Sequence, residues 1–207
     1  ALKDDGTVVA WGDNGKGQCE VPSDLNDVAC IHAVYNLSMA VKKDGTVVVW
    51  GNNNYGQCEV PSDLNDVVYA TGTNNTCAAL KANGTVVVWG SDGDCGRCNI
   101  PAGLHDVVSV SVYGGYICAI KKDGTVVVWG YKKSAGSINP QVENLIAAKN
   151  VIAITPRVPC MVCHEGTLDY YWAYQEDEEG IKALFDEVNV LSGHHFAVNN
   201  LEMLNSN

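Results

Sequence analysis

The chain repeats one pattern of apolar and polar positions about every 40 residues. A polar Asp-Gly or Asn-Gly pair is followed by Thr, by a run of Val residues and by Trp-Gly, and the tryptophans of this run are Trp11, Trp50, Trp89 and Trp129. The steps from 11 to 50, from 50 to 89 and from 89 to 129 are 39, 39 and 40 residues. A repeat of this length is typical of a fold built from stacked, similar units.

Within the unit 44–82 the pattern predicts short β-strands. We expect four of them, at residues 46–50, 57–60, 67–71 and 76–80. The pair Asp44-Gly45 predicts a type I′ hairpin turn before the first strand, and Pro61 ends the second strand because it cannot donate to a ladder. In the first strand Val47 and Val49 face one way and Trp50 faces the other, so both faces are apolar and the strand should be covered on both sides.

Four short strands per unit predict a β-propeller, with an all-β fold and one domain over residues 1–207. The tryptophan of each unit is expected to wedge between neighbouring blades. About five four-stranded blades follow, with a degenerate last one, from the repeats 5–43, 44–82, 83–122, 123–164 and 165–200. The chain is either a complete ring of five blades or part of a longer protein.

Composition and charge narrow the classes of function. Hydrophobic residues make up 46% of the chain and charged residues 18%, which is typical of a globular protein. No apolar run is long enough to predict a membrane span. The net charge of −11, from 13 basic and 24 acidic residues, disfavours nucleic acid as a partner, since binding there depends on Lys and Arg. The charge serves either solubility or attraction to a basic partner.

The pattern of the nine cysteines indicates that they are small core residues and not the partners of a disulfide scaffold. Cys19, Cys58 and Cys98 recur at one repeat position, after Gly-Gln or Gly-Arg. Buried cysteine often acts as a small hydrophobic residue, so a reducing compartment such as the cytoplasm is favoured over a disulfide-forming one. Secretion is left open.

Two cysteine motifs suggest chemistry. The run from Cys160 to His164 matches the pattern for covalent haem attachment, but the repeat register also explains it as a strand entering a turn. The pair Cys95 and Cys98 could join it in a four-cysteine zinc site, yet 62 residues separate Cys98 from Cys160. We therefore predict no metal and no cofactor. No nucleophile–base pair or phosphate loop is recognisable, so no catalytic residue is predicted and the chain is not expected to be an enzyme.

The repeated residues resemble the regulator of chromosome condensation repeat family. The resemblance rests on the Asp-Gly-Thr-Val-x-x-Trp-Gly-x-Asn-x-x-Gly-Gln run, the following proline, and the Val-x-x-(Ile/Val) strand before Ala-Leu-Lys. The short form Val-Pro-x-x-Leu-x-x-Val is most similar to the bacterial branch, which includes a propeller-type secreted inhibitor of β-lactamases. The resemblance implies a propeller, commonly of seven blades in this family, and implies no particular function, since fold alone does not fix function.

The loops predict where a partner protein binds. In a meandering blade alternate loops share an end, so the Asp-Gly turns lie at one end, and the loops after Trp-Gly lie at the other with the turns that precede the last strand of each unit. The first end is nearly identical in every unit, whereas the second differs and carries Tyr, Asn and Arg, which are favoured at interfaces. The predicted partner-binding residues are Asn14, Lys16, Tyr35, Asn53, Asn54, Tyr55, Asn74, Asn75, Asp92, Tyr113, Tyr116, Tyr131, Lys132 and Arg157.

The sequence therefore predicts a non-enzymatic module that binds another protein through its variable loops. Two alternatives stay open: a structural component of a larger assembly, cell surface or virion, and an inhibitor of a secreted hydrolase.

Overall fold

A computed structural model describes residues 1–91, 96–113, 115–130, 151–155, 161–164 and 167–170. The described part is all-β, as predicted. Its strands are β1 (Val28–Val34), β2 (Leu37–Lys42), β3 (Val47–Gly51), β4 (Val67–Gly72), β5 (Thr76–Lys81), β6 (Val86–Gly90), β7 (Val107–Tyr113), β8 (Tyr116–Lys121), β9 (Val126–Gly130), β10 (Val151–Thr155), β11 (Met161–His164) and β12 (Thr167–Tyr170). Within these residues no helix is long and apolar enough to cross a membrane.

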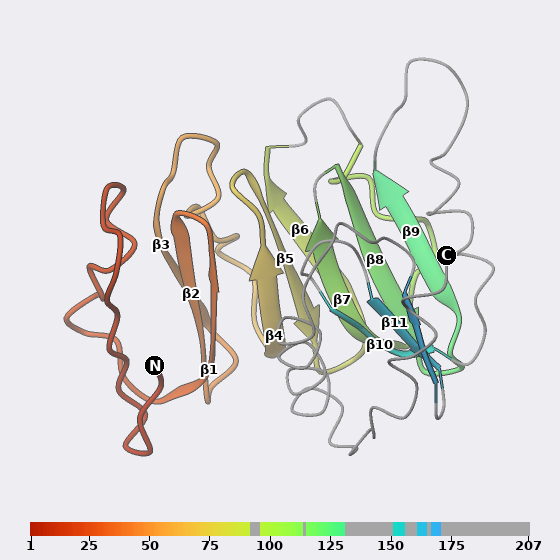
Figure 1. The fold of residues 1–207 in the computed structure, drawn as a ribbon, viewed down its shortest axis with the longest axis horizontal. Helices are drawn as coiled ribbons and strands as arrows, with labels where there is room; N and C mark the ends of the chain where they lie inside the picture. The colour runs from red at the N-terminus through yellow and green to blue at the C-terminus, as the bar shows by residue number, and fades with distance from the viewer. Residues whose placement is uncertain (92–95, 114, 131–150, 156–160, 165–166, 171–207) are drawn as a thin grey trace, which may run out of the picture.

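The strands form four antiparallel sheets of three strands each, in the orders β1-β2-β3, β4-β5-β6, β7-β8-β9 and β10-β11-β12. The first three sheets stand side by side along the chain (Figure 1). Each sheet is offset from the sequence repeat, because the unit 44–82 gives β3 to one sheet and β4 and β5 to the next. The blade therefore joins the last two strands of one repeat to the first strand of the following repeat.

The predicted strand at residues 57–60 is wrong, and the described sheets have three strands instead of four. These residues belong to a turn and an extended segment. The N–H of Glu59 donates to the carbonyl O of Gly56 at 3.1 Å, and the N–H of Cys58 donates to Oδ1 of Asn53 at 2.9 Å. Because these donors are satisfied within the loop, no ladder forms there.

The hairpin before β3 also differs from the predicted type I′ turn. Gly45 has a φ of +80°, but Asp44 is absent from the residues with positive φ. The N–H of Gly45 donates to the carbonyl O of Lys42 at 2.9 Å, which is the pattern of a tight turn followed by one left-handed residue. A Cβ on Gly45 would lie 2.9 Å from the Cα of Asp66, so glycine is required both for backbone conformation and for space.

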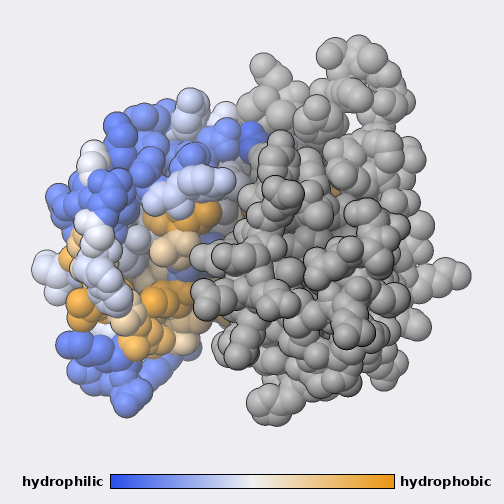
Figure 2. All heavy atoms as spheres, viewed as in Figure 1, coloured by the Kyte–Doolittle hydropathy of each residue, from blue (hydrophilic) through white to orange (hydrophobic). Residues whose placement is uncertain are grey.

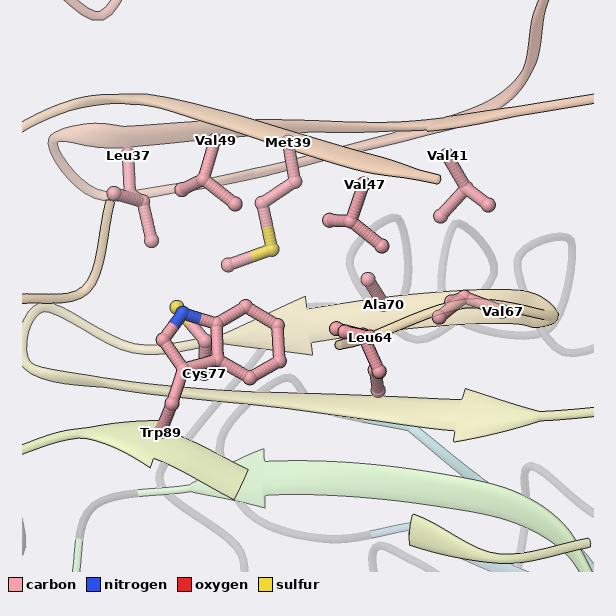
Figure 3. Close-up of a cluster of buried hydrophobic side chains, with 11 residues drawn as sticks. Leu37, Met39, Val41, Val47, Val49, Leu64, Val67, Ala70, Cys77 and Trp89 are labelled. Carbon is pink, nitrogen blue, oxygen red and sulfur yellow. The ribbon is translucent and has the colours of Figure 1, made fainter. Parts of the chain in front are cut away.

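Apolar side chains join each sheet to the next, and the prediction that both faces of β3 are covered is confirmed. Val47 and Val49 pack in a cluster that also holds Cys77 and Trp89 of the following sheet (Figure 3). Trp50, on the opposite face of β3, packs in a separate cluster with residues of the N-terminal segment.

Three of the repeated tryptophans lie between units, as predicted, whereas Trp11 is 73% exposed and does not. Trp50, Trp89 and Trp129 are 9%, 6% and 8% exposed. Trp89 packs against residues of the preceding sheet, and Trp129 belongs to a cluster that includes Ala78 and Leu80 of the sheet before it. The repeating contact between sheets is thus an indole ring against the preceding unit.

The later repeats are described only in part. β11 begins at Met161 and runs to His164, which agrees with the predicted strand, and it pairs with β12 from Thr167. The predicted turn at residues 165 and 166 lies outside the described residues. β10 lies against β7 and β8. Residues 171–200, assigned from sequence to the degenerate unit, lie outside the described residues.

Candidate functional site

Hydrogen bonds place the two predicted sets of loops at opposite ends of the sheets. The N–H of Asn52, after β3, donates to the carbonyl O of Asn36 in the β1–β2 turn at 2.8 Å, and the N–H of Ser91 donates to the carbonyl O of Asn75 at 2.7 Å. The loops that begin after Gly51 and after Gly90 therefore lie beside the turn between the first two strands of their own sheets. We call this end, formed among the described residues by 12–19, 35–36, 52–58, 73–75, 91 and 96–97, the variable end.

The opposite end is built in the same way in the three units for which the structure describes it. Val28, Val67 and Val107 begin the first strand of their sheets, and each donates its N–H to the carbonyl O of the preceding turn glycine, at 3.1, 3.0 and 3.0 Å. The preceding Asp in each case has positive φ. We call this end the constant end, because backbone geometry sets its residues.

Asparagine side chains hold the loops of the variable end. Oδ1 of Asn14 accepts the N–H of Cys19, and Oδ1 of Asn53 accepts the N–H of Cys58, both at 2.9 Å. These two predicted partner-binding residues thus also stabilise their own loops. The bond leaves the amide nitrogen of Asn53 as the group that could face a partner.

A buried glutamine connects three segments at this end, and sequence reasoning did not identify its role. Gln57 is fully buried. Its Oε1 accepts the N–H of Tyr55 at 2.9 Å, its Nε2 donates to the carbonyl O of Asn74 at 2.5 Å, and its own carbonyl O accepts Nε1 of Trp89 at 2.9 Å. The recurrence of Gly-Gln-Cys after the first two Trp-Gly loops, with Gly-Arg-Cys after the third, is the signal that could have revealed it.

The same position recurs in the neighbouring units. The carbonyl O of Gln18 accepts Nε1 of Trp50 at 3.0 Å, and that of Arg97 accepts Nε1 of Trp129 at 2.8 Å. Arg97 is 3% exposed, and its guanidinium donates to Oδ1 of Asn75 at 3.2 Å. Each loop of the variable end is therefore tied both to its own unit and to the next.

Two tyrosines project from these fixed loops. Tyr35 is 70% exposed and Tyr55 is 55% exposed. Among the other predicted partner-binding residues, the structure exposes Asn14, Lys16, Asn53, Asn54 and Asn74 and half-buries Asn75 and Tyr116. Asp92, Tyr131, Lys132, Arg157 and the side chain of Tyr113 lie outside the described residues.

Tyr35 has an unusual backbone conformation. It begins the two-residue turn between β1 and β2 and has a φ of +49°. Bulky residues rarely adopt this left-handed conformation, which costs on the order of 1–3 kcal/mol. The other non-glycine residues with positive φ in the described chain are Asp27, Asp66 and Asp106, which share one structural position. Tyr35 has no such equivalent.

A groove of about 280 Å³ lies next to Tyr35, between the N-terminal segment and the β1–β2 hairpin. Trp11 and Tyr35 line it, together with Val9, Ile31 and Asp13. Trp11 is 73% exposed, unlike the other described tryptophans. Figure 2 shows hydrophobic side chains gathered over this part of the molecule and bordered by hydrophilic ones.

The described side chains offer little reactive chemistry. Burial raises the pKa of the Cys77 thiol far above its ordinary value and also raises the pKa of Cys30, so both stay protonated at neutral pH. Burial lowers the pKa of His32, whose Nε2 lies 3.3 Å from Oγ1 of Thr71. No group of three or more His, Cys, Asp or Glu that could hold a metal occurs among the described residues. Cys95 of the predicted zinc pair and Cys160 of the haem-like motif lie outside the described residues.

Comparison with solved structures identifies the fold. Human WBSCR16 matches with a TM-score of 0.52 at 17% identity, over 67% of this chain and 46% of that one. Yeast RCC1 (Prp20), in its complex with Kap60, matches with a TM-score of 0.50 at 21% identity, over 60% of this chain and 40% of that one. The chain thus spans less than half the length of the structures it matches. Among curated proteins, none matches its sequence.

Comparison with family models agrees with the resemblance drawn from the repeated residues. The model that matches is the regulator of chromosome condensation (RCC1) repeat, over residues 1–18 and 28–57. These residues cover the first two Trp-Gly runs and the sheet β1-β2-β3. The described chain is therefore all-β, and its residues 1–18 and 28–57 match the regulator of chromosome condensation (RCC1) repeat.

Proposed function

We propose that this chain is a non-catalytic module that binds another protein through its variable end. The observation that carries the proposal is the contrast between the two ends. The constant end repeats the same backbone bonds in three described units, whereas the variable end presents different exposed side chains in the first two units, on loops held by hydrogen bonds. Preformed loops that carry aromatic residues are a favourable binding surface, because little conformational entropy is lost on association.

The anchoring of Tyr55 supports this proposal. Its N–H donates to the buried Gln57, while 55% of the residue stays exposed. The backbone is thus fixed and the ring is available, which is the arrangement that makes tyrosine effective at interfaces. Yeast RCC1, which has the same fold, was solved bound to the protein Kap60.

The test compares one residue from each end. The full chain, immobilised, is used to isolate its partner from the native source. Binding of that purified partner is then measured for Tyr55→Ala and for Asp63→Ala, an exposed residue three positions before Asp66 of the constant end. We expect Tyr55→Ala to weaken binding by about tenfold or more, with Asp63→Ala near the wild type and both variants unchanged in thermal unfolding. Equal losses in the two variants would refute the assignment of the binding end.

A further inference from the structure

We propose that Asn83 is a site of spontaneous deamidation, at which this chain converts its own asparagine into aspartate. Asn83 is exposed and precedes Gly84 in the turn between β5 and β6. Asparagine before glycine is prone to this reaction, because glycine has no side chain that would obstruct attack by its own nitrogen on the carboxamide. The site belongs to the constant end, so this inference does not rest on the proposed function.

The adjacent units show that the fold accommodates the product. Asp44 and Asp123 occupy the position of Asn83 in the turns before and after it. Oδ1 of Asp44 accepts the N–H and the hydroxyl of Thr46 at 3.0 and 2.6 Å. Oδ1 of Asn83 accepts the same two groups of Thr85 at 3.0 and 2.7 Å. The turn around Asn83 is therefore already arranged as it is around a carboxylate.

The two donors of Thr85 favour ring closure. The N–H of Gly84 first breaks its bond to the carbonyl O of Lys81, which is 2.9 Å long, and gives its proton to solvent base. The nitrogen then bonds to Cγ of Asn83, and Oδ1 takes up negative charge that the N–H and hydroxyl of Thr85 stabilise. The bond from Cγ to Nδ2 breaks, Nδ2 takes up a proton and leaves as ammonia, and a cyclic imide remains.

Water, the only other reactant, opens the imide at one of its two carbonyl carbons. Attack at Cγ gives aspartate, and the donors of Thr85 again stabilise the charge on its oxygen. Attack at the main-chain carbonyl gives isoaspartate, which adds one carbon to the backbone of the turn. The turn is fixed on both sides of Gly84, whose N–H donates to Lys81 at 2.9 Å and whose carbonyl O accepts the N–H of Val107 at 3.0 Å. Aspartate is therefore expected as the main product in the folded chain.

A second Asn-Gly pair, Asn14 and Gly15, provides an internal comparison. The N–H of Gly15 is also bonded, to Oδ1 of Asp13 at 3.1 Å, so neither nitrogen is free at the start. The carboxamides differ, because Oδ1 of Asn14 accepts the N–H of Cys19 at 2.9 Å, a donor five residues along the chain instead of two. The negative charge of Asp13 also opposes the charge that develops on the nitrogen of Gly15. Asn83 should therefore react faster than Asn14.

The experiment incubates the full chain in buffer at pH 8 and follows the conversion of amide to acid at Asn83 and Asn14 by peptide mass spectrometry. We expect Asn83 to convert at least about threefold faster than Asn14. Aspartate should exceed isoaspartate at this position, as read with an endoprotease that cleaves before aspartate but not before isoaspartate. Equal rates at the two sites, faster conversion of Asn14, or isoaspartate as the main product would each overturn the proposal.

A variant of the donor residue tests the role of the turn directly. Thr85→Val removes the hydroxyl and keeps both the backbone N–H and the branched shape of the side chain. It should slow the conversion of Asn83 by about threefold or more and leave the conversion of Asn14 unchanged, with thermal unfolding used to verify that the variant is folded. If Asn83 converts as fast in Thr85→Val as in the wild type, the inference fails. None of these results bears on partner binding at the variable end, which the Tyr55→Ala experiment tests separately.

Discussion

Removing the indole of Trp89 tests the packing between units. Its ring is 6% exposed and fills a cluster with Leu37 and Met39 of the preceding sheet. Truncation of a buried tryptophan to alanine costs about 3–5 kcal/mol. The carbonyl O of Gln57 also loses its bond from Nε1, which adds about 1 kcal/mol. We therefore expect Trp89→Ala to lower the free energy of unfolding by about 4–6 kcal/mol, a large share of the roughly 5–15 kcal/mol typical of a domain.

The assay is urea unfolding followed by circular dichroism, with thermal unfolding as a second measure. At about 2–4 °C per kcal/mol for a chain of this size, the Tm should fall by roughly 10–20 °C. Trp89→Phe keeps most of the packing and should lose only about 1–2 kcal/mol. The matched control is Trp11→Ala, a 73% exposed residue, which should change stability by less than about 0.5 kcal/mol. If Trp89→Ala and Trp11→Ala agree to within about 1 kcal/mol, the account of interblade packing is wrong.

Three further predictions concern the turns and the thiols. Gly45→Ala should lower the free energy of unfolding in urea more than Gly103→Ala does, by about 1–3 kcal/mol. Both glycines have positive φ (+80° and +76°), but only a Cβ at position 45 would meet backbone, at 2.9 Å. Equal losses in the two variants would show that backbone conformation alone matters. Asn83→Asp should gain stability at neutral pH, because the aspartates at the same turn position, such as Asp44, have a pKa lowered mainly by hydrogen bonds from a threonine. A carboxylate whose pKa is lower in the folded than in the unfolded protein stabilises the fold at pH values above its unfolded pKa. The gain in stability from Asn83→Asp should therefore disappear as the pH falls through the folded pKa of the new carboxylate. A gain that persists in acid would contradict this. Cys77 should resist alkylation at pH 8 in the native protein and react in urea, as read by peptide mass spectrometry, because burial raises its pKa; rapid native labelling would place the thiol elsewhere.

Much of the fold follows from local pattern. The continuous apolar run before Trp50, Trp89 and Trp129 predicted β3, β6 and β9, and the two apolar faces of β3 predicted a covered sheet. These features depend on side-chain periodicity, which sequence displays directly. The offset between repeat and sheet depends on which strand pairs with which, and periodicity does not contain that information.

The errors have local causes. Residues 57–60 carry apolar side chains at alternate positions, as a strand would, but Asn53 supplies a side-chain acceptor for the N–H of Cys58. Asparagine competes with ladders in this way. Asp44 was assigned positive φ from the Asp-Gly pair, whereas its carboxylate accepts the N–H and hydroxyl of Thr46 at 3.0 and 2.6 Å and the glycine alone adopts that conformation.

The sequence predicted which loops and which kinds of residue form the candidate site, but it did not predict their conformation or exposure. The division into two ends was visible from the variation among units, and the exposure of Tyr55 agrees with it. The strained turn at Tyr35 and the exposure of Trp11 were not predictable. The first is a backbone property, and the second depends on which units surround the ring in three dimensions.

The bond from the indoles of Trp50, Trp89 and Trp129 to a carbonyl oxygen 32 residues earlier has a consequence for how such chains evolve. Donor and acceptor belong to consecutive units, so duplication or loss of one whole unit restores the same bond at the new junction. A shorter insertion between the two residues would lengthen the span and break it. Growth by complete units is therefore the route that this architecture tolerates, and the number of units can drift while the contact between neighbours stays the same.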